Sequence, residues 1–386
     1  MNYNKIGLFV CLSFLAFAIA GCKKTEDAPD DWHPTPYQIT VPSHFPDEMN
    51  IPSDNPMTVE GIALGRYLFY DGRMSGRTDP DSLMSCATCH LQSHAFECGL
   101  NNPAFPGGRP HGLTGIPTPH SMMPLINMVW VDSGYLWNGK VSKYNPSPHY
   151  RNLEDLTWMS VLAPHEMNGD TNRVKALFQS INGYPELFEK AFGSKVITMK
   201  NMGRAIAQFI RTLISSDSRF DRFLRGEVAL TTSERTGYVL FMTELGADCF
   251  HCHGGEGNPL FTTHFFYNNG KDSVFTDPSD RASVTGDPVD VGAYKAPTLR
   301  NIAFTAPYMH DGRFTTLDEV INFYSERVIW SPTISPLMHH VRDHGVRLTL
   351  MEKLALKDFL YTLSDSSFLT NPAFSQPAAF PDGIAH

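Results

Sequence analysis

Two short motifs of the same form constrain this chain more than any other feature. Each has two cysteines separated by two residues and followed directly by a histidine, at residues 86–90 (CATCH) and 249–253 (CFHCH). Two thiols at this spacing can form thioether bonds to one haem, and the histidine can then bind the iron. The repeat predicts two c-type haems. The anchors would be Cys86, Cys89, Cys249 and Cys252, and the iron ligands His90 and His253.

Other uses of a C-x-x-C pair fit this sequence less well. A structural zinc site takes four ligands, usually from two paired motifs, whereas each motif here offers three and has no evident partner pair. A thioredoxin-like dithiol needs a βαβ setting, and the sequence shows no such pattern. His251 lies between the two cysteines of the second motif. We interpret it as a spacer, because the attachment geometry turns that position away from the iron.

The first residues have the pattern of an export signal. A short polar, basic start precedes an apolar run from Ile6 to Ala20, which is short for a bilayer span of about 20 residues. The run ends in Ala20-Gly21-Cys22, which resembles the bacterial lipobox. We therefore expect residues 1–21 to be a lipoprotein signal and Cys22 to carry lipid. The alternative is an ordinary cleaved signal.

The cysteines leave little for disulfide bonds. Of the seven in the chain, Cys11 lies in the signal, Cys22 takes lipid and four belong to the haem motifs, so only Cys98 remains. Because exported proteins often depend on disulfides, we expect the haems to stabilise this fold instead. The formal net charge of −9 argues against a nucleic-acid partner.

Helical periodicity dominates the rest of the chain. Residues 22–56 are rich in proline and lack a helical period, so we expect a flexible tether. Thr58 is expected to cap a helix that runs to Tyr70. Capping boxes are expected to begin three later helices, at Thr231-x-x-Glu234, Thr316-x-x-Glu319 and Thr349-x-x-Glu352.

The order of helix, C-x-x-C-H motif, loops and further helices occurs twice, and no regular strands are expected. This pattern predicts a mainly α fold made of two tandem cytochrome-c-like domains, each with one covalently bound haem. We place the first domain at residues 57–227 and the second at residues 228–386. The tail after Ser366 is expected to pack as coil.

Both motifs lie within a longer pattern that resembles the bacterial di-haem cytochrome c peroxidase family, which includes MauG. The matching segments are 64–70 (LGRYLFY), 85–90 (SCATCH), 136–140 (LWNGK), 165–167 (HEM), 249–253 (CFHCH), 295–301 (KAPTLRN) and 305–314 (TAPYMHDGRF). The resemblance implies two mainly helical domains with a calcium ion between them. It also implies that the haem on His90 binds hydrogen peroxide. The haem on His253 would take electrons from a small donor, such as cytochrome c or a cupredoxin.

The resemblance assigns Glu166 and Trp137 to the chemistry. Glu166 matches the family's acidic residue, which takes a proton from one peroxide oxygen and gives one to the other. A carboxyl in a semi-buried pocket is expected to have a raised pKa suited to this task. Trp137 matches a tryptophan between the two haems, where an indole can help to carry an electron. From the residues alone, the alternatives are a surface carboxylate and an ordinary core tryptophan.

The sixth iron ligands are left open. At the position that decides the second haem's partner, well-studied peroxidases have methionine and MauG has tyrosine, and this chain has Tyr324. Tyr324 shares a helix face with apolar residues, so a buried core tyrosine is the alternative. Met309 and Met338 are further candidates. For the first haem only His111 and His120 are candidates, and without them that iron keeps an open site.

Several positions depart from the family pattern. Leu156 stands where the family usually has a glutamine in the distal pocket, and Ser160 stands where it often has proline. Losing the glutamine removes a hydrogen bond near the bound oxygen. For calcium, Thr305 and Pro307 match the backbone-carbonyl ligands, whereas Ser121 stands where asparagine is usual.

These observations predict a di-haem cytochrome-c peroxidase, which reduces hydrogen peroxide to water with electrons from a small redox protein. One alternative is a MauG-like oxidase that acts on a partner protein. The other is a di-haem electron carrier without catalysis. We expect a periplasmic location, with a membrane anchor through Cys22 and with a homodimer as one open oligomeric state.

Overall fold

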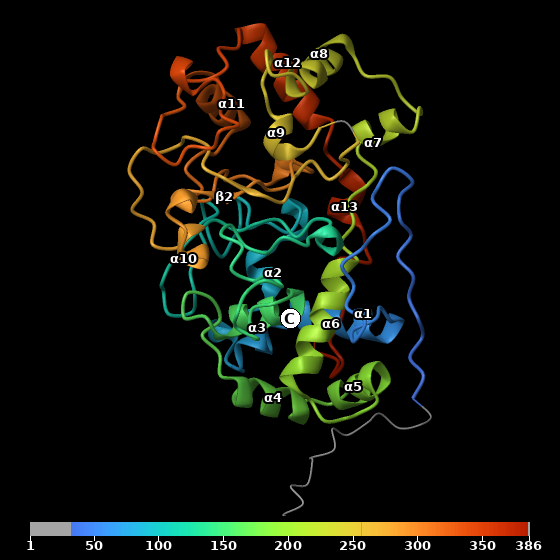
Figure 1. The fold of residues 1–386 in the computed structure, drawn as a ribbon. Coiled ribbons are helices and arrows are strands. Elements are labelled where there is room, and N and C mark those ends of the chain that lie inside the picture. The colour runs from blue at the N-terminus through green and yellow to red at the C-terminus, as the bar shows by residue number, and fades with distance from the viewer. Residues whose placement is uncertain (1–31, 256, 385–386) are drawn as a thin grey trace, which may run out of the picture.

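The computed structural model describes residues 32–255 and 257–384, and this part of the chain is mainly helical (Figure 1). The first half contains α1 (Val59–Tyr70), α2 (Cys86–Cys89), α3 (Leu153–Leu162), α4 (Thr171–Ser180), α5 (Tyr184–Phe192), α6 (Met199–Arg211) and α7 (Arg219–Leu224). The second half contains α8 (Thr232–Phe241), α9 (Phe250–His253), α10 (Ala282–Thr285), α11 (Leu317–Glu326), α12 (Leu350–Tyr361) and α13 (Ser366–Thr370).

The expected caps begin the helices. The Thr58 hydroxyl accepts a hydrogen bond from the Gly61 N–H at the start of α1. The three capping boxes are present at the starts of α8, α11 and α12. Each box satisfies backbone N–H groups that would otherwise have no partner in the first turn. The sequence therefore predicted these helix starts correctly.

Each half contains a close helix crossing that depends on a glycine. In the first half α1 packs on α6, and a Cβ atom at Gly65 would overlap the carbonyl oxygen of Ala205. In the second half α8 packs on α12, and a Cβ atom at Gly237 would overlap the carbonyl oxygen of Ala355. In each crossing a phenylalanine four residues after the alanine also faces the glycine. The same local packing thus occurs twice.

A small antiparallel sheet was not expected from the sequence. It pairs β1 (Phe266–Tyr267) with β2 (Tyr294–Lys295), with Phe266 opposite Lys295. Strands of two residues are too short to produce an alternating pattern. The sheet lies in the long connection between α9 and α11.

Residues 32–56 differ from the flexible tether that the sequence predicts. Ile39 and Phe45 are buried, and the Phe45 ring packs on Trp130 with the ring centroids 5.1 Å apart. The Arg300 guanidinium of the second half lies 4.8 Å from the Phe45 ring centroid. Although the segment has no helical period, its apolar side chains fill a cluster that joins both halves. In Figure 1 it runs along one side of the molecule toward α7 and then back to α1.

The C-terminal tail also departs from the expected domain division. Phe368 and Phe374 are buried in the hydrophobic core of the first half, not the second. The Tyr70 hydroxyl donates to the carbonyl of Phe374 at 2.6 Å, and Arg66 donates to the carbonyl of Ser375 at 2.7 Å. The tail that follows the second half therefore completes the core of the first half. Figure 1 shows α13 lying away from α8 and α12, toward α6.

The expected signal at residues 1–21 and the expected lipid attachment at Cys22 lie outside the described residues. Among the described helices, none combines the length and the apolar character needed to cross a bilayer.

Candidate haem sites

The first motif forms one helical turn, α2, with its histidine directly behind it. The Ser85 N–H donates to the Thr88 hydroxyl at 3.0 Å, which fixes the start of this turn. The His90 Nδ1 atom lies 2.6 Å from the carbonyl oxygen of Phe96. Because a carbonyl can only accept, Nδ1 carries the proton and Nε2 keeps its lone pair. Burial also lowers the pKa of His90, so the ring is neutral, as an iron ligand must be.

The second motif repeats this arrangement. The His253 Nδ1 atom lies 3.0 Å from the carbonyl oxygen of Pro297, which again leaves Nε2 for a metal. Burial lowers the pKa of His253 to about 4. The sequence identified both histidines, but it gave no sign of the two carbonyl groups that orient them. Those carbonyls come from loops whose course depends on the tertiary fold.

The cysteines of both motifs are neutral thiols. Burial, with a smaller effect of the Glu166 charge, raises the pKa of Cys86 to about 12, and burial beside Asp248 raises that of Cys252 to about 12. None of the described cysteines forms a disulfide bond. Cys98, the cysteine left over, is fully buried and accepts a hydrogen bond from Asn102 at 3.4 Å. Its position indicates a packing role.

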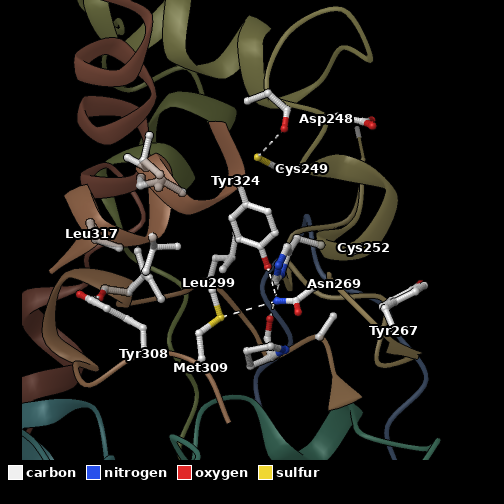
Figure 2. A pocket seen from close by; sticks show the side chains of 18 of the residues that line it. Asp248, Cys249, Cys252, Tyr267, Asn269, Leu299, Tyr308, Met309, Leu317 and Tyr324 are labelled. Carbon is white, nitrogen blue, oxygen red and sulfur yellow. Dashed lines mark hydrogen bonds between the residues drawn. The ribbon is translucent and has the colours of Figure 1, made fainter. Parts of the chain in front are cut away.

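A cavity surrounds the second motif, and its wall is mostly apolar. Figure 2 shows the inner face of this wall. The haem-motif residues Cys249, Cys252 and His253 line it, together with the candidate ligands Tyr324, Met309 and Met338 and with Trp137. A mostly apolar cavity beside two thiols and a neutral imidazole fits a covalently attached haem.

Two candidate sixth ligands meet within this cavity. Asn269 Nδ2 donates to the Tyr324 hydroxyl at 3.0 Å and lies 3.7 Å from the Met309 sulfur, as Figure 2 shows. Burial raises the pKa of Tyr324, partly offset by the Asn269 hydrogen bond. Tyr324 therefore faces the cavity and does not simply fill the core. Sequence reasoning missed Asn269 because it lies in an irregular loop.

Glu166 lies beside the first motif. It follows α3 on a turn, and its charge contributes to the raised pKa values of Cys86 and Cys89. Burial raises the pKa of Glu166, and a hydrogen bond from the Ser160 hydroxyl works against that rise. The His165 Nε2 atom lies 3.9 Å from Glu166 Oε1. The structure thus brings the predicted acid to the predicted peroxide site.

Leu156, one turn before Ser160 on α3, packs against the core of the first half, as do Cys86 and Cys89. Near the first motif, α3 therefore presents an apolar side chain at Leu156 and a hydroxyl at Ser160. The sequence marked Ser160 as a departure from the family pattern, but it did not reveal the hydrogen bond from Ser160 to Glu166.

Trp137 lies where the two halves meet. Its Nε1 atom donates to the carbonyl of Ser121 at 2.9 Å, and its ring meets His310 edge-on with a centroid distance of 6.5 Å. The Ser121 hydroxyl in turn donates to the Met309 carbonyl at 2.7 Å. Trp137 is therefore held rigidly at the wall of the second cavity by contacts from both halves.

The two histidines considered for the first haem have other contacts. His120 Nε2 lies 2.7 Å from Asp277 of the second half, and its ring packs edge-on against Tyr294. His111 is exposed and packs against Phe105 with a centroid distance of 5.1 Å. Of the two, only His120 has its Nε2 atom held by a carboxylate.

Two of the three residues considered for calcium, Pro307 and Ser121, lie near one another. A Cβ atom at Gly312 would lie 3.2 Å from the Pro307 ring and 3.5 Å from the Ser121 Cβ. Thr305 and Pro307 both line the second cavity. Together with Ser121 they offer neutral oxygen atoms, so a calcium ion held here would keep several water ligands.

Known proteins share these features. Residues 59–229 match the family model described as di-haem cytochrome c peroxidase. The chain is 29% identical to cytochrome-c peroxidase IdrP1 of Pseudomonas sp. (strain SCT), over 98% of this chain and 99% of that protein. It is 31% identical to methylamine utilization protein MauG of Methylorubrum extorquens, over 82% of this chain and 84% of that protein. A solved MauG-like protein associated with microbial copper homeostasis superposes with a TM-score of 0.75 and 34% identity, covering 88% of this chain and 99% of that one.

These relatives are similar to the chain over most of their length. The two neutral histidines, the paired thiols and the carboxyl beside the first motif are compatible with that similarity. The chain belongs to the di-haem cytochrome c peroxidase family, whose members are oxidoreductases with two c-type haems.

Proposed function

We propose that this protein reduces hydrogen peroxide to water at the site on His90, with electrons that enter through the site on His253. One H2O2 takes up two electrons and two protons, its O–O bond breaks, and two water molecules leave. The observation that carries the proposal is the position of Glu166, a carboxyl with a raised pKa beside the first haem motif.

We further propose that each half is a cytochrome-c-like domain with one haem. The glycine-dependent crossings of α1 with α6 and of α8 with α12, each associated with one C-x-x-C-H motif, support this division. When bound, haem supplies the oxidation and reduction chemistry at both sites. The four motif cysteines would attach it, and His90 and His253 would bind the iron through Nε2.

Glu166 moves the protons. As a carboxylate it would accept a proton from one peroxide oxygen, and as a carboxylic acid it would donate that proton to the departing oxygen. Its raised pKa matters for the second step, because a carboxyl with an ordinary pKa would hold the proton too weakly near neutral pH. The Ser160 hydroxyl limits the rise, so the carboxylate form remains available for the first step.

Trp137 and Tyr324 are proposed to act in electron transfer. Trp137 lines the second cavity and is fixed by Ser121, so its indole can carry an electron toward the first site without reorganising. We propose Tyr324 as the sixth ligand of the second iron, with Met309 as the alternative, because both face the cavity and contact Asn269. A tyrosinate ligand would lower the reduction potential relative to a thioether.

Three further features belong to the proposal. The lipobox-like sequence supports export and a membrane anchor at Cys22, on the periplasmic side. The proximity of Pro307 and Ser121 at Gly312 supports a calcium ion held by the carbonyls of Thr305 and Pro307 and by water. A small redox protein would be the electron donor.

Steady-state turnover tests the proposal. The holoprotein is mixed with a reduced c-type cytochrome and hydrogen peroxide, and oxidation of the cytochrome is followed. Glu166→Gln should slow turnover by about 10²–10⁴-fold, the usual contribution of a positioned acid–base group, with both haems still attached. Glu186→Gln, at an exposed glutamate paired with Lys195, is the matched control. Turnover in Glu166→Gln equal to that of the control would contradict the role of Glu166, and no turnover in the parent would favour an electron carrier.

A second candidate function is supported by Tyr324. A tyrosine facing the second cavity fits a MauG-like oxidase, which stores oxidising equivalents and oxidises a partner protein. Such an oxidase would react with peroxide without a reduced cytochrome and would then decay slowly. Fast, sustained oxidation of the cytochrome favours the peroxidase.

A further inference from the structure

A cluster of side chains beside the second haem motif has no part in the proposed peroxide chemistry. Glu244, His251 and His339 each offer a ligand atom, and these atoms all lie within 4.8 Å of one another. A fourth residue, Asp248, contacts both histidines. We propose that this cluster binds one divalent transition-metal ion that prefers imidazole ligands, Zn2+ or Cu2+.

Asp248 orients the two histidines. Its Oδ1 atom lies 2.5 Å from His251 Nδ1, and its Oδ2 atom lies 3.4 Å from His339 Nδ1. One carboxylate therefore faces the Nδ1 atoms of both rings. This favours the tautomers in which both Nε2 atoms keep a lone pair for a metal. A carboxylate behind a histidine in this way is the usual second-shell arrangement of metal-binding histidines.

The free nitrogen of His251 faces the third ligand. His251 Nε2 lies 3.4 Å from Glu244 Oε1, and the rings of His251 and His339 meet edge-on with a centroid distance of 5.1 Å. Two imidazoles and one carboxylate would leave a further position for water, as in open tetrahedral sites. Neighbouring His340 does not join them, because its Nε2 atom contacts the Glu244 carbonyl at 2.8 Å. That contact helps to position the Glu244 backbone.

Burial and charge also favour a cation. The Asp248 side chain is 7% exposed, whereas those of His339 and Glu244 are 40% and 60% exposed. An ion can therefore enter from solvent and bind imidazoles that a buried carboxylate holds in place. The two carboxylates bring negative charge to the cluster, which a divalent ion would neutralise.

The position of the cluster has a consequence for the haem. His251 lies between the two anchoring cysteines of the second motif, so the spacer predicted from sequence would be a metal ligand of a different site. A divalent charge this close disfavours the ferric form of the neighbouring haem. Metal binding should therefore raise the reduction potential of that haem.

The test uses the holoprotein with both haems attached, after treatment with a chelator. Zn2+ binding is measured by calorimetry and Cu2+ binding by equilibrium dialysis in a parallel series. The parent should bind one ion per chain. Glu244→Gln and His339→Ala should weaken binding by at least about tenfold, and Asp248→Asn by about 10–100-fold, as for other second-shell carboxylates.

His149→Ala removes an exposed histidine elsewhere and should leave binding unchanged. Circular dichroism and thermal unfolding, measured on the same samples, check that the variants are folded. Failure of the parent to bind either ion would overturn the proposal. Binding that survives all three variants would do the same, since the ion would then lie elsewhere.

Discussion

At the scale of single residues, Ser160 moderates the pKa of Glu166. Burial raises the pKa of Glu166, and the Ser160 hydroxyl partly reverses the rise by stabilising the carboxylate. Removing the hydroxyl in Ser160→Ala should therefore raise that pKa further. Because turnover needs the carboxylate to accept the first proton, the acid limb of the kcat/KM profile should move to higher pH. An exposed serine changed in the same way, Ser180→Ala, should leave the limb in place, and a limb moved to lower pH in Ser160→Ala would contradict this role.

The ligand of the second iron is a choice between two side chains. If Tyr324 binds, Tyr324→Phe should change the ferric absorption and EPR spectra of that haem and raise its reduction potential, because phenolate stabilises ferric iron. Met309→Leu should then leave the ferric spectrum unchanged. The reverse pattern would assign the ligand to Met309. Tyr361→Phe, at a tyrosine that is 47% exposed, is the matched control.

At the scale of helices, Gly65 and Gly237 allow the two close crossings. An added methyl group would meet backbone oxygen in both cases, and backbone cannot move aside as a side chain can. Gly65→Ala and Gly237→Ala should each destabilise the holoprotein by about 1–3 kcal/mol, the range for overpacked interiors. Denaturant unfolding measures this, and Thr236→Ala, at an exposed position on α8, should have little effect. Near-parental stability of both glycine variants would show that the crossings are not tight.

The helices were more predictable from sequence than the groups that complete the sites. Capping residues such as Thr58 and Thr231 act within one turn, so the local sequence revealed them. The C-x-x-C-H spacing is equally local. The carbonyl of Pro297 and the amide of Asn269 reach their partners only through the tertiary fold, whereas the carbonyl of Phe96 lies six residues from His90 in an irregular turn. No local pattern marks such contacts.

At the scale of the whole molecule, two irregular segments pack across the boundary between the two halves. The segment at 32–56 covers both, and the tail after Ser366 packs into the first. Sequence periodicity could not reveal this, because both segments are irregular and their partners are distant in the chain. The expected boundary near residue 228 thus divides the helices into two groups, but it does not divide the hydrophobic cores as cleanly.

The tail should therefore stabilise the first half. Phe374 is 8% exposed and packs in that core, and Phe374→Ala should cost about 3–5 kcal/mol. Hydrogen exchange should rise in α1 and around His90 more than in α8 or α12. Ile384→Ala, at a residue 48% exposed in the same tail, should change little. Faster exchange confined to α8 and α12 would show that the tail stabilises the second half instead.

The division of labour between the two haems is the central claim, and an anaerobic titration tests it most directly. The fully reduced holoprotein is mixed with hydrogen peroxide, and the absorption of both haems is followed. One equivalent of peroxide should oxidise both haems, because it takes two electrons and each haem supplies one. Glu166→Gln should slow this reaction by about 10²–10⁴-fold. Oxidation of only one haem per peroxide, or a parental rate in Glu166→Gln, would contradict the account.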